Sequence, residues 1–392
     1  MPSPTDPNAV TATNFQDPPH SAWGFHHVRE RQPTAKVWRG PGPVWALMNE
    51  PRDIGAIAYQ AGDGGTRTVA DMLSGDHLDG FIALHRGVIV AEAYGNGMRP
   101  QDTHILMSTT KSFTGSLAGV LADQGLLDTQ ARVTDVLPKL DGTAYDGATV
   151  RHLLDMRVGL DFSEDYDNPE SDFAYLDAAS GWRPPIRPDA PDNLLDFMRI
   201  IRAEPPHGGA FHYVSANSVV LGWVLEAVAG EPFADLLSRL IWQPMGAEFD
   251  ADLAVDRQGR SQTEGGLNVT LRDLARFGEL HRLGGIVDGR RVVPEAWIKD
   301  MRENGDADAW DKGTMAGPFP GHHYRSQWYT NRQHPHKPFF TLGAFGQTVF
   351  VDPVAELVMA KLSCFPGGSG EDALWGDLMR AFYAIGDSFA GS

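Results

Sequence analysis

The stretch His104 to Asp128, HILMSTTKSFTGSLAGVLADQGLLD, places Lys111 three positions after Ser108 at the start of an amphipathic segment. The apolar residues of this segment recur at the spacing of one buried helix face: Phe113, Leu117, Val120 and Leu121. Gly125 is a residue type that commonly follows the end of a helix. The pattern predicts a helix that begins near Ser108 and carries Ser108 and Lys111 on one side, about one turn apart.

A serine and a lysine in this arrangement can form a catalytic pair. A serine hydroxyl is a weak nucleophile until a base removes its proton, and a lysine can be that base when burial lowers its pKa. The unpaired N–H groups at a helix start also favour a developing negative charge. The alternative is that Ser108 only caps the helix and Lys111 is solvated. On these residues alone both interpretations stay open, although a first-turn lysine opposes the helix dipole.

Length and charge limit the possible classes of protein. The chain has 392 residues, which favours two subdomains, and its 42% hydrophobic and 21% charged residues are typical of a folded globular protein. It carries 33 basic and 51 acidic residues, a net charge of −18. This balance argues against nucleic acid and against membrane surfaces as partners.

The single cysteine and the N-terminus bear on the cellular compartment. Cys364 alone forms no internal disulfide. The N-terminus is polar and proline-rich and does not resemble a secretory signal, and no apolar window is long enough to span a bilayer. We therefore expect a soluble cytoplasmic protein, although a mature form without its signal would have a similar sequence.

Strand patterns occur at both ends of the chain, and helical patterns occur between them. Residues 1 to about 40 look irregular, and Phe81–Gly95 reads as a hairpin turning at Arg86-Gly87. Helical patterns follow Thr149, include SANSVVLGWVLEAVAG, and begin again at Thr270. YRSQWYT, FFTLGAFGQTVFVDP and LVMAKLSC are rich in strand formers, and an amphipathic helix ends the chain.

Four segments resemble a known superfamily. They are MSTTKSFTGSLAGVLADQGLLDTQARVTDVLPKL, TVRHLLDMRVGLDF, NVTLRDLARFGELHRLGG and GAFGQTVFVDP. They resemble the serine β-lactamase and D,D-peptidase superfamily, in the branch of class C β-lactamases and family VIII carboxylesterases, and most of all the nylon-oligomer hydrolases. The resemblance runs from about Trp23 to the C-terminus. It implies an α/β (α+β) fold with an antiparallel sheet flanked by helices (41–105 and 251–392) and an inserted all-α subdomain (106–250).

The resemblance assigns the reaction to residues of three motifs. Ser108 and Lys111 take the nucleophile and base positions, and Tyr213 in YVSAN takes the place of a proton-transferring tyrosine whose pKa Lys111 would lower. Without the resemblance, Tyr213 reads as a buried aromatic residue. In GAFGQ the cation of the third motif is missing and Phe345 stands there, whereas Ala344 supplies a backbone N–H that would form the oxyanion hole with that of Ser108.

Further positions would bind the substrate. Tyr166 in EDYDNP corresponds to a tyrosine that contacts the substrate amide, and Asp177 in YLDAASGW corresponds to an aspartate that attracts a substrate ammonium. Trp182 matches the family's tryptophan in that segment. Ser215 stands two residues after Tyr213, where many relatives have asparagine and the nylon-oligomer hydrolases have serine. Glu264 replaces asparagine or histidine and would attract an ammonium or perturb Tyr166. By itself, a loop aspartate such as Asp177 is usually just solvated.

These observations predict a serine hydrolase that forms an acyl-enzyme on linear amides of the 6-aminohexanoate-oligomer type, with carboxylesterase side activity. The alternatives are a family VIII-like carboxylesterase, a β-lactamase or D,D-peptidase, and a non-catalytic binding protein of the same fold. The histidine pairs at 322–323 and 334–336 lack the spacing of a zinc site. We expect no metal, no cofactor and a homodimer.

Overall fold

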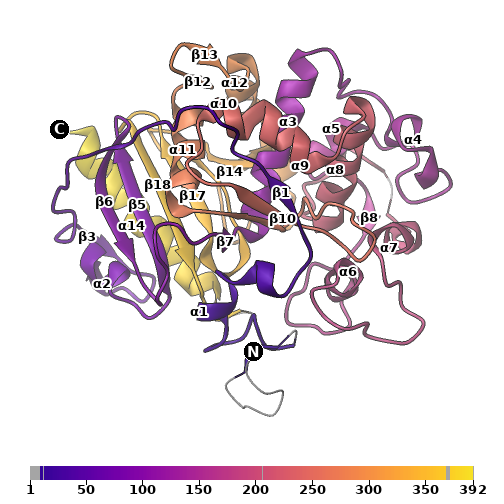
Figure 1. Ribbon diagram of the computed structural model, residues 1–392, viewed down its shortest axis with the longest axis horizontal. Coiled ribbons are helices and arrows are strands. Elements are labelled where there is room, and N and C mark those ends of the chain that lie inside the picture. Colours follow the sequence, from indigo (N-terminus) through magenta and orange to yellow (C-terminus); the bar gives the residue numbers. More distant parts are fainter. Residues whose placement is uncertain (1–8, 12, 205, 368–370, 392) are drawn as a thin grey trace.

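A computed structural model describes residues 9–11, 13–204, 206–367 and 371–391. In Figure 1 a large sheet and its covering helices lie on one side of the molecule, and a group of helices lies on the other. The predicted α/β architecture with a mainly antiparallel sheet is confirmed. The division into subdomains at 106 and 250 stays a prediction.

The large sheet joins the two ends of the chain. Its strands, in spatial order, are β14 (His322–Arg325), β15 (Trp328–Asn331), β16 (Phe339–Phe340), β17 (Thr348–Asp352), β18 (Leu357–Ser363), β5 (Leu78–His85), β6 (Val88–Tyr94) and β2 (Met48–Asn49). All neighbours are antiparallel except β2, which runs parallel to β6. Arg86 and Gly87 have φ of 53° and 80°, so the predicted hairpin turns through two left-handed residues, as tight hairpins require.

A second sheet leads into the Ser108 segment. Its order is β1 (Thr34–Val37), β10 (Ala251–Ala254), β11 (Leu267–Val269) and β7 (His104–Ile105), and β7 ends just before Ser108. The segment that we expected to be irregular, residues 1–40, therefore contributes strand β1, together with α1 (Ser21–Gly24) and η1 (Val28–Glu30). Residues 1–8 and 12 of that segment lie outside the described part of the chain. No local pattern predicted strand β1, because it is formed by pairing with β10, which lies far along the sequence.

Helices cover both faces of the large sheet. On β5, Ile82 and Leu84 face the core beneath α11 (Leu271–Arg282), whereas Phe81 and Ala83 face α14 (Glu371–Ala390). At Gly278 of α11 an added Cβ would lie 2.6 Å and 2.7 Å from two valine side chains of the sheet. The absence of a side chain there therefore lets the helix pack closely against the strands.

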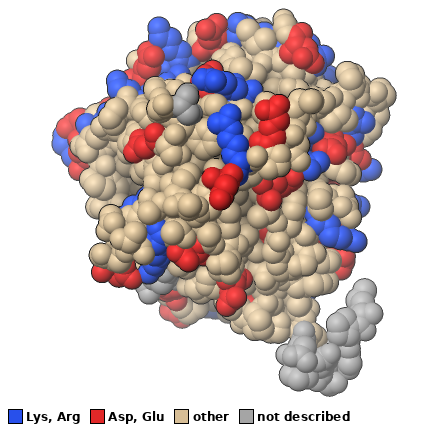
Figure 2. All heavy atoms as spheres, turned by 90° about the vertical axis from the view of Figure 1, so that its left-hand side faces the viewer, with Lys and Arg blue, Asp and Glu red and all other residues tan. Residues whose placement is uncertain are grey.

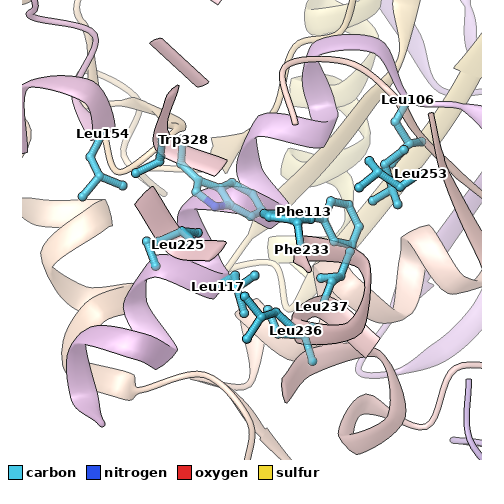
Figure 3. Close-up of a cluster of buried hydrophobic side chains, with 14 of the residues drawn as sticks. Leu106, Phe113, Leu117, Leu154, Leu225, Phe233, Leu236, Leu237, Leu253 and Trp328 are labelled. Carbon is cyan, nitrogen blue, oxygen red and sulfur yellow. The ribbon is translucent and has the colours of Figure 1, made fainter. Parts of the chain in front are cut away.

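Helix α3 (Thr110–Asp123) is buried between the sheet and the helical group. It contacts α8 (Ser215–Ala229), α9 (Phe233–Leu237) and β15. Figure 3 shows the apolar cluster that α3 shares with its neighbours: Leu106, Phe113, Leu117, Leu154, Leu225, Phe233, Leu236, Leu237, Leu253 and Trp328. This packing fixes α3, and with it the positions of Ser108 and Lys111.

The remaining elements are short or connect the main ones. They are β3 (Ala58–Gln60), β4 (Thr66–Thr68), α2 (Val69–Leu73), η2 (Met107–Thr109), α4 (Val133–Val136), η3 (Pro138–Leu140), α5 (Val150–Leu154), β8 (Leu160–Asp161), α6 (Asp172–Ser180), α7 (Leu194–Ile200), β9 (Arg202–Ala203), η4 (Ser238–Trp242), α10 (Gln243–Met245), β12 (Ile286–Val287), β13 (Arg290–Arg291), α12 (Glu295–Glu303), α13 (Ala307–Asp311) and η5 (Ala344–Gly346). In the described ranges, no helix combines the length and the apolar character needed to cross a membrane.

The charge of the chain is not gathered on the face that contains the hairpin β5–β6. Figure 2 shows acidic and basic side chains interspersed among uncharged ones there. The net charge of −18 is therefore not expressed as a continuous patch of one sign on this face.

Candidate active site

The turn that carries Ser108 links strand β7 to helix α3. Leu106 N donates to Leu267 O at 2.8 Å, which ties this turn to β11. Met107 has φ of 47°, an uncommon value for a residue other than glycine, and such conformations cluster at functional sites. Thr109, not Ser108, is the N-cap of α3. The Ser108 side chain is therefore not used to cap this helix.

Lys111 is buried, and its side chain returns to Ser108. Lys111 Nζ donates to Ser108 Oγ at 2.7 Å and to the backbone oxygen of Glu264 at 2.6 Å. Only 2% of Lys111 is exposed, so the solvated alternative is wrong. Burial lowers the pKa of Lys111 to about 8, against the opposing effect of Glu164 and Glu264. At neutral pH about a tenth of the amine is then unprotonated, in contact with the hydroxyl that it would deprotonate.

Tyr213 lies beside both Lys111 and Ser108. Lys111 Nζ is 5.1 Å from the centroid of the Tyr213 ring, and the phenol interacts by side-chain hydrogen bonds with Ser108, Tyr329 and Ser215. We expected Lys111 to lower the pKa of Tyr213, and this is wrong. Burial, followed by the charge of Glu164, raises the pKa of Tyr213 above its ordinary value. Tyr213 is therefore a neutral phenol that can relay or donate a proton.

Glu164 is a site residue that the sequence analysis missed. One carboxylate oxygen accepts from Ser215 Oγ and, at 3.2 Å, from the Tyr166 hydroxyl, and the other accepts from Ser215 N at 2.9 Å. Burial raises the pKa of Glu164, while Lys111 and Ser215 lower it. The signal was present in EDYDNP, but only burial beside Lys111 distinguishes Glu164 from its acidic neighbours.

The turn η5 brings Ala344 against the Ser108 turn. Thr109 Oγ1 lies 2.9 Å from Thr341 Oγ1 and 3.1 Å from Gln347 O, which connects the two segments. A Cβ added to Gly343 would lie 2.4 Å from Leu106 O and 3.1 Å from Thr109 N. The two backbone segments thus approach more closely than any other residue at 343 would allow. The predicted oxyanion pair, Ser108 and Ala344, lies at this contact.

Two cavities meet at Ser108. The acidic cavity, of about 400 Å³, includes in its lining Asp17, Asp167, Asp177, Arg183, Glu264 and Phe345. The aromatic cavity, of about 460 Å³, includes in its lining Phe162, Glu164, Tyr213, Met315, Phe319 and Trp375. Of the described residues, Ser108, Tyr166 and Ala344 line both. A substrate that reaches Ser108 can therefore extend to both sides of its reacting bond.

Asp177 is buried on α6 and does not lie on a solvated loop. Arg183 Nε donates to Asp177 Oδ2 at 2.6 Å, so a cation of the chain itself already contacts the predicted ammonium acceptor. Arg183 also donates to Gln16 Oε1 at 3.5 Å, and Trp182 stacks on Phe15 with ring centroids 5.6 Å apart. Neither the Arg183–Asp177 ion pair nor the contacts of this segment with Phe15 and Gln16 was predicted from the sequence.

Glu264 offers a carboxylate oxygen with no protein partner. Its Oε1 accepts from Ser180 Oγ at 3.4 Å, whereas Oε2 is buried and has no hydrogen-bond partner among the described residues. Burial raises the pKa of Glu264 to about 7, with Lys111 opposing the shift and Asp177 adding to it. A second carboxylate therefore faces the acidic cavity beside Asp177.

Phe345 belongs to an apolar wall. It packs against Phe25 with ring centroids 4.9 Å apart and has a φ of 64°. The structure thus places an aromatic ring where the resembled families carry a cation. Within the described ranges, no group of three or more His, Cys, Asp or Glu side chains is arranged to hold a metal ion.

The site combines a buried Ser–Lys pair, a neutral tyrosine and a backbone turn between the sheet strands β16 and β17. This combination defines a class of protein, the active-site serine hydrolases of the β-lactamase type. Residues 66–383 match the Beta-lactamase family, and the chain belongs to that family. It is a serine hydrolase with the β-lactamase-like fold, as the resemblance predicted.

Similar proteins extend this assignment. The chain is 34% identical to 6-aminohexanoate-dimer hydrolase of Paenarthrobacter ureafaciens over 358 residues, 91% of this chain and 88% of that protein. It is 25% identical to penicillin-binding protein 4 of Amycolatopsis lactamdurans over 58% of this chain and 62% of that protein. A Bacillus anthracis structure proposed to be a 6-aminohexanoate-dimer hydrolase superimposes with a TM-score of 0.89, at 26% identity, covering 99% of this chain and 98% of that one.

Proposed function

We propose that this serine hydrolase cleaves linear amides of the 6-aminohexanoate-oligomer type through an acyl-enzyme on Ser108, with carboxylesterase side activity. The observation that carries the proposal is the 2.7 Å contact of buried Lys111 Nζ with Ser108 Oγ. The similarity to 6-aminohexanoate-dimer hydrolase over 91% of the chain supports the choice of substrate.

The proposed reaction has two stages. Unprotonated Lys111 takes the Ser108 proton as Oγ attacks the carbonyl carbon, and the N–H groups of Ser108 and Ala344 stabilise the oxyanion. The tetrahedral intermediate then expels the amine, which receives a proton through Tyr213. Water next attacks the ester, gives up a proton to the same groups, and releases the carboxylic acid and free Ser108.

The acidic cavity suits the acyl half of such a substrate. The carboxylates of Asp177 and Glu264 attract an ammonium several bonds from the scissile carbonyl, and unpartnered Glu264 Oε2 is free to accept from it. Arg183 offsets part of the attraction of Asp177. Both carboxylates are therefore proposed to share the binding of the ammonium.

The alternatives differ in the substrate. A carboxylesterase with another natural substrate would use the same Ser108 chemistry. A β-lactamase or D,D-peptidase must hold a substrate carboxylate beside η5, where this chain has Phe345, packed on Phe25, in place of the cation of the third motif. That observation disfavours it. A homodimer and a cytoplasmic location, which the resemblance and the sequence suggested, remain predictions.

The test is a hydrolysis panel of 6-aminohexanoate dimer, a short-chain nitrophenyl ester and nitrocefin, with Ser108→Ala as the control for each. We expect turnover of the dimer and the ester but not of nitrocefin. The double change Asp177→Gly and Glu264→Gln should lower kcat/KM for the dimer at least about tenfold, because a partly desolvated charge pair is worth about that much. The kcat/KM for the ester should change little. Hydrolysis of the ester alone would identify a carboxylesterase instead.

A further inference from the structure

The aromatic cavity lies beside the proposed proton donor. Tyr213 is among its lining residues but not among those of the acidic cavity. At about 460 Å³ it is as large as the acidic cavity, and its walls include Phe162, Phe319 and Trp375. Under the proposed function, on which this inference rests, nothing has yet been assigned to this space.

The direction of the substrate follows from the position of Tyr213. The leaving nitrogen or oxygen must come within hydrogen-bond reach of the group that protonates it. Because Tyr213 interacts with Ser108 from the side of the aromatic cavity, the leaving half points into that cavity. The acyl half then extends into the acidic cavity, past Glu264.

The charges of the aromatic cavity determine which leaving group suits it. Its described lining includes the acidic residues Glu164 and Asp372 and one histidine, His212, but neither lysine nor arginine. A carboxylate at the far end of the leaving half would therefore meet two acidic side chains and would find no lysine or arginine among the described lining residues. A neutral hydrocarbon chain or aromatic ring would instead bury apolar surface against the walls.

We propose that the aromatic cavity is a leaving-group subsite that prefers neutral aliphatic or aromatic amines and alcohols over ω-amino carboxylates. The reaction is unchanged: the acyl–nitrogen or acyl–oxygen bond breaks, the acyl group passes to Ser108 Oγ, and the leaving atom takes a proton. The consequence concerns 6-aminohexanoate dimer itself, whose leaving half ends in a carboxylate. It is a poorer substrate than the amide that 6-aminohexanoic acid forms with hexylamine.

The first test compares the hydrolysis of these two amides by the wild-type protein. They share the acyl half, the chain length and the type of scissile bond, and they differ in a terminal methyl group against a carboxylate. We expect kcat/KM to be at least tenfold higher for the hexylamide. At high salt, where the repulsion is screened, the ratio should shrink.

The second test places a cation in the cavity. Met315→Lys should change the ratio of the two kcat/KM values at least fivefold in favour of the dimer. Met48→Lys is the matched control, because it adds the same charge on the exposed strand β2, where 65% of Met48 is accessible, and should leave the ratio unchanged. If Met315→Lys does not fold, the ratio of the two kcat/KM values in the wild type still tests the subsite assignment.

The outcomes separate this inference from the proposed function. Equal kcat/KM for the two amides, or a preference for the dimer, overturns the inference and leaves the proposed amidase function standing. If neither amide is hydrolysed, the proposed function fails and the subsite assignment fails with it. A fivefold change with Met48→Lys as well would show a general charge effect and would also overturn the assignment.

Discussion

At the scale of single residues, burial makes the amine of Lys111 usable as a base. A solvated lysine is almost fully protonated at neutral pH, whereas the pKa of Lys111 is lowered to about 8 because its charged form is poorly solvated. The pKa of Tyr213 is shifted in the opposite direction, because burial and the charge of Glu164 raise it and keep the phenol protonated. The two residues therefore complement each other, one able to accept a proton and the other to supply one.

The first prediction is a pH dependence. Because only unprotonated Lys111 can deprotonate Ser108, kcat/KM for a neutral nitrophenyl ester should rise about tenfold per pH unit below pH 8 and level off above it. The measurement is a pH–rate profile from pH 5 to 10. A profile that is flat across this range would exclude Lys111 as the base.

The second prediction concerns Glu264. Burial raises its pKa from an ordinary value near 4.5 to about 7. Folding thus favours the protonated form, and stability is lost as pH rises from 4.5 through 7. Glu264→Gln removes this loss and should raise the free energy of unfolding by roughly 1–3 kcal/mol at pH 8, with little change at pH 4.5. Denaturant unfolding at pH 4.5 and pH 8 measures this change, with the exposed Glu303→Gln as the control. An equal change in the free energy of unfolding at the two pH values would contradict the prediction.

At the scale of elements, the site depends on the approach of η5 to η2. The turn η2 contains Ser108 and the turn η5 contains Ala344, so neither turn alone supplies both N–H groups of the proposed oxyanion hole. Thr109 Oγ1 holds them together through Thr341 and Gln347, and Gly343 permits the close approach. The oxyanion pair therefore depends on contacts between two segments that are far apart in the sequence.

The third prediction follows from this approach. In Gly343→Ala the new Cβ would lie 2.4 Å from Leu106 O, so η5 must shift away from Ser108. Loss of an oxyanion donor lowers kcat by about 100-fold or more, and we expect a loss of at least tenfold for ester hydrolysis. Gly42→Ala is the control, since a Cβ there has no neighbour within 4 Å. Unchanged kcat in Gly343→Ala would show that Ala344 does not stabilise the oxyanion.

At the scale of the whole molecule, the N-terminal segment forms part of the wall of the acidic cavity. Phe15, Phe25 and Val28 form a cluster with Ile105 and Cys364, next to Phe345 and Trp182. Gln16 and Asp17 line the acidic cavity. The segment therefore connects the stability of the chain to the shape of the cavity.

The fourth prediction tests this connection. Phe25 is fully buried, and Phe25→Ala should lower the free energy of unfolding by about 3–5 kcal/mol and raise KM for 6-aminohexanoate dimer. Trp23→Ala is the control, because Trp23 is 41% exposed, and should cost less than about 1 kcal/mol. Thermal unfolding and steady-state kinetics provide the two values. A stable Phe25→Ala variant with normal KM would show that the N-terminal segment does not affect substrate binding.

Local signals explain which parts of the fold were predictable. Helix α3 has its apolar stripe, α8 ends at Gly230 in the left-handed conformation, and α11 begins at the cap Thr270, so each is encoded within one short segment. Strand β1 was missed because its structure comes from pairing with β10. The motif residues Ser108, Lys111 and Tyr213 lie together in the structure, and their catalytic roles stay a prediction.

Properties that depend on long-range packing were not predictable. The pKa of Tyr213 depends on how deeply it is buried and on Glu164, and the availability of Asp177 depends on Arg183. Glu164 itself gains importance only because folding places it beside Lys111 and Ser215. The sequence shows the residue types in each case but not the distances between them.

Covalent labelling identifies the nucleophile, which we propose to be Ser108. The protein is incubated with a fluorophosphonate, and the modified residue is mapped by peptide mass spectrometry in wild type, in Ser108→Ala and in Ser112→Ala as a neighbouring control. We expect one adduct, on Ser108, in the wild type and in Ser112→Ala. Ser108→Ala should show neither this adduct nor any turnover. An adduct on another serine, or turnover that persists in Ser108→Ala, would contradict this assignment.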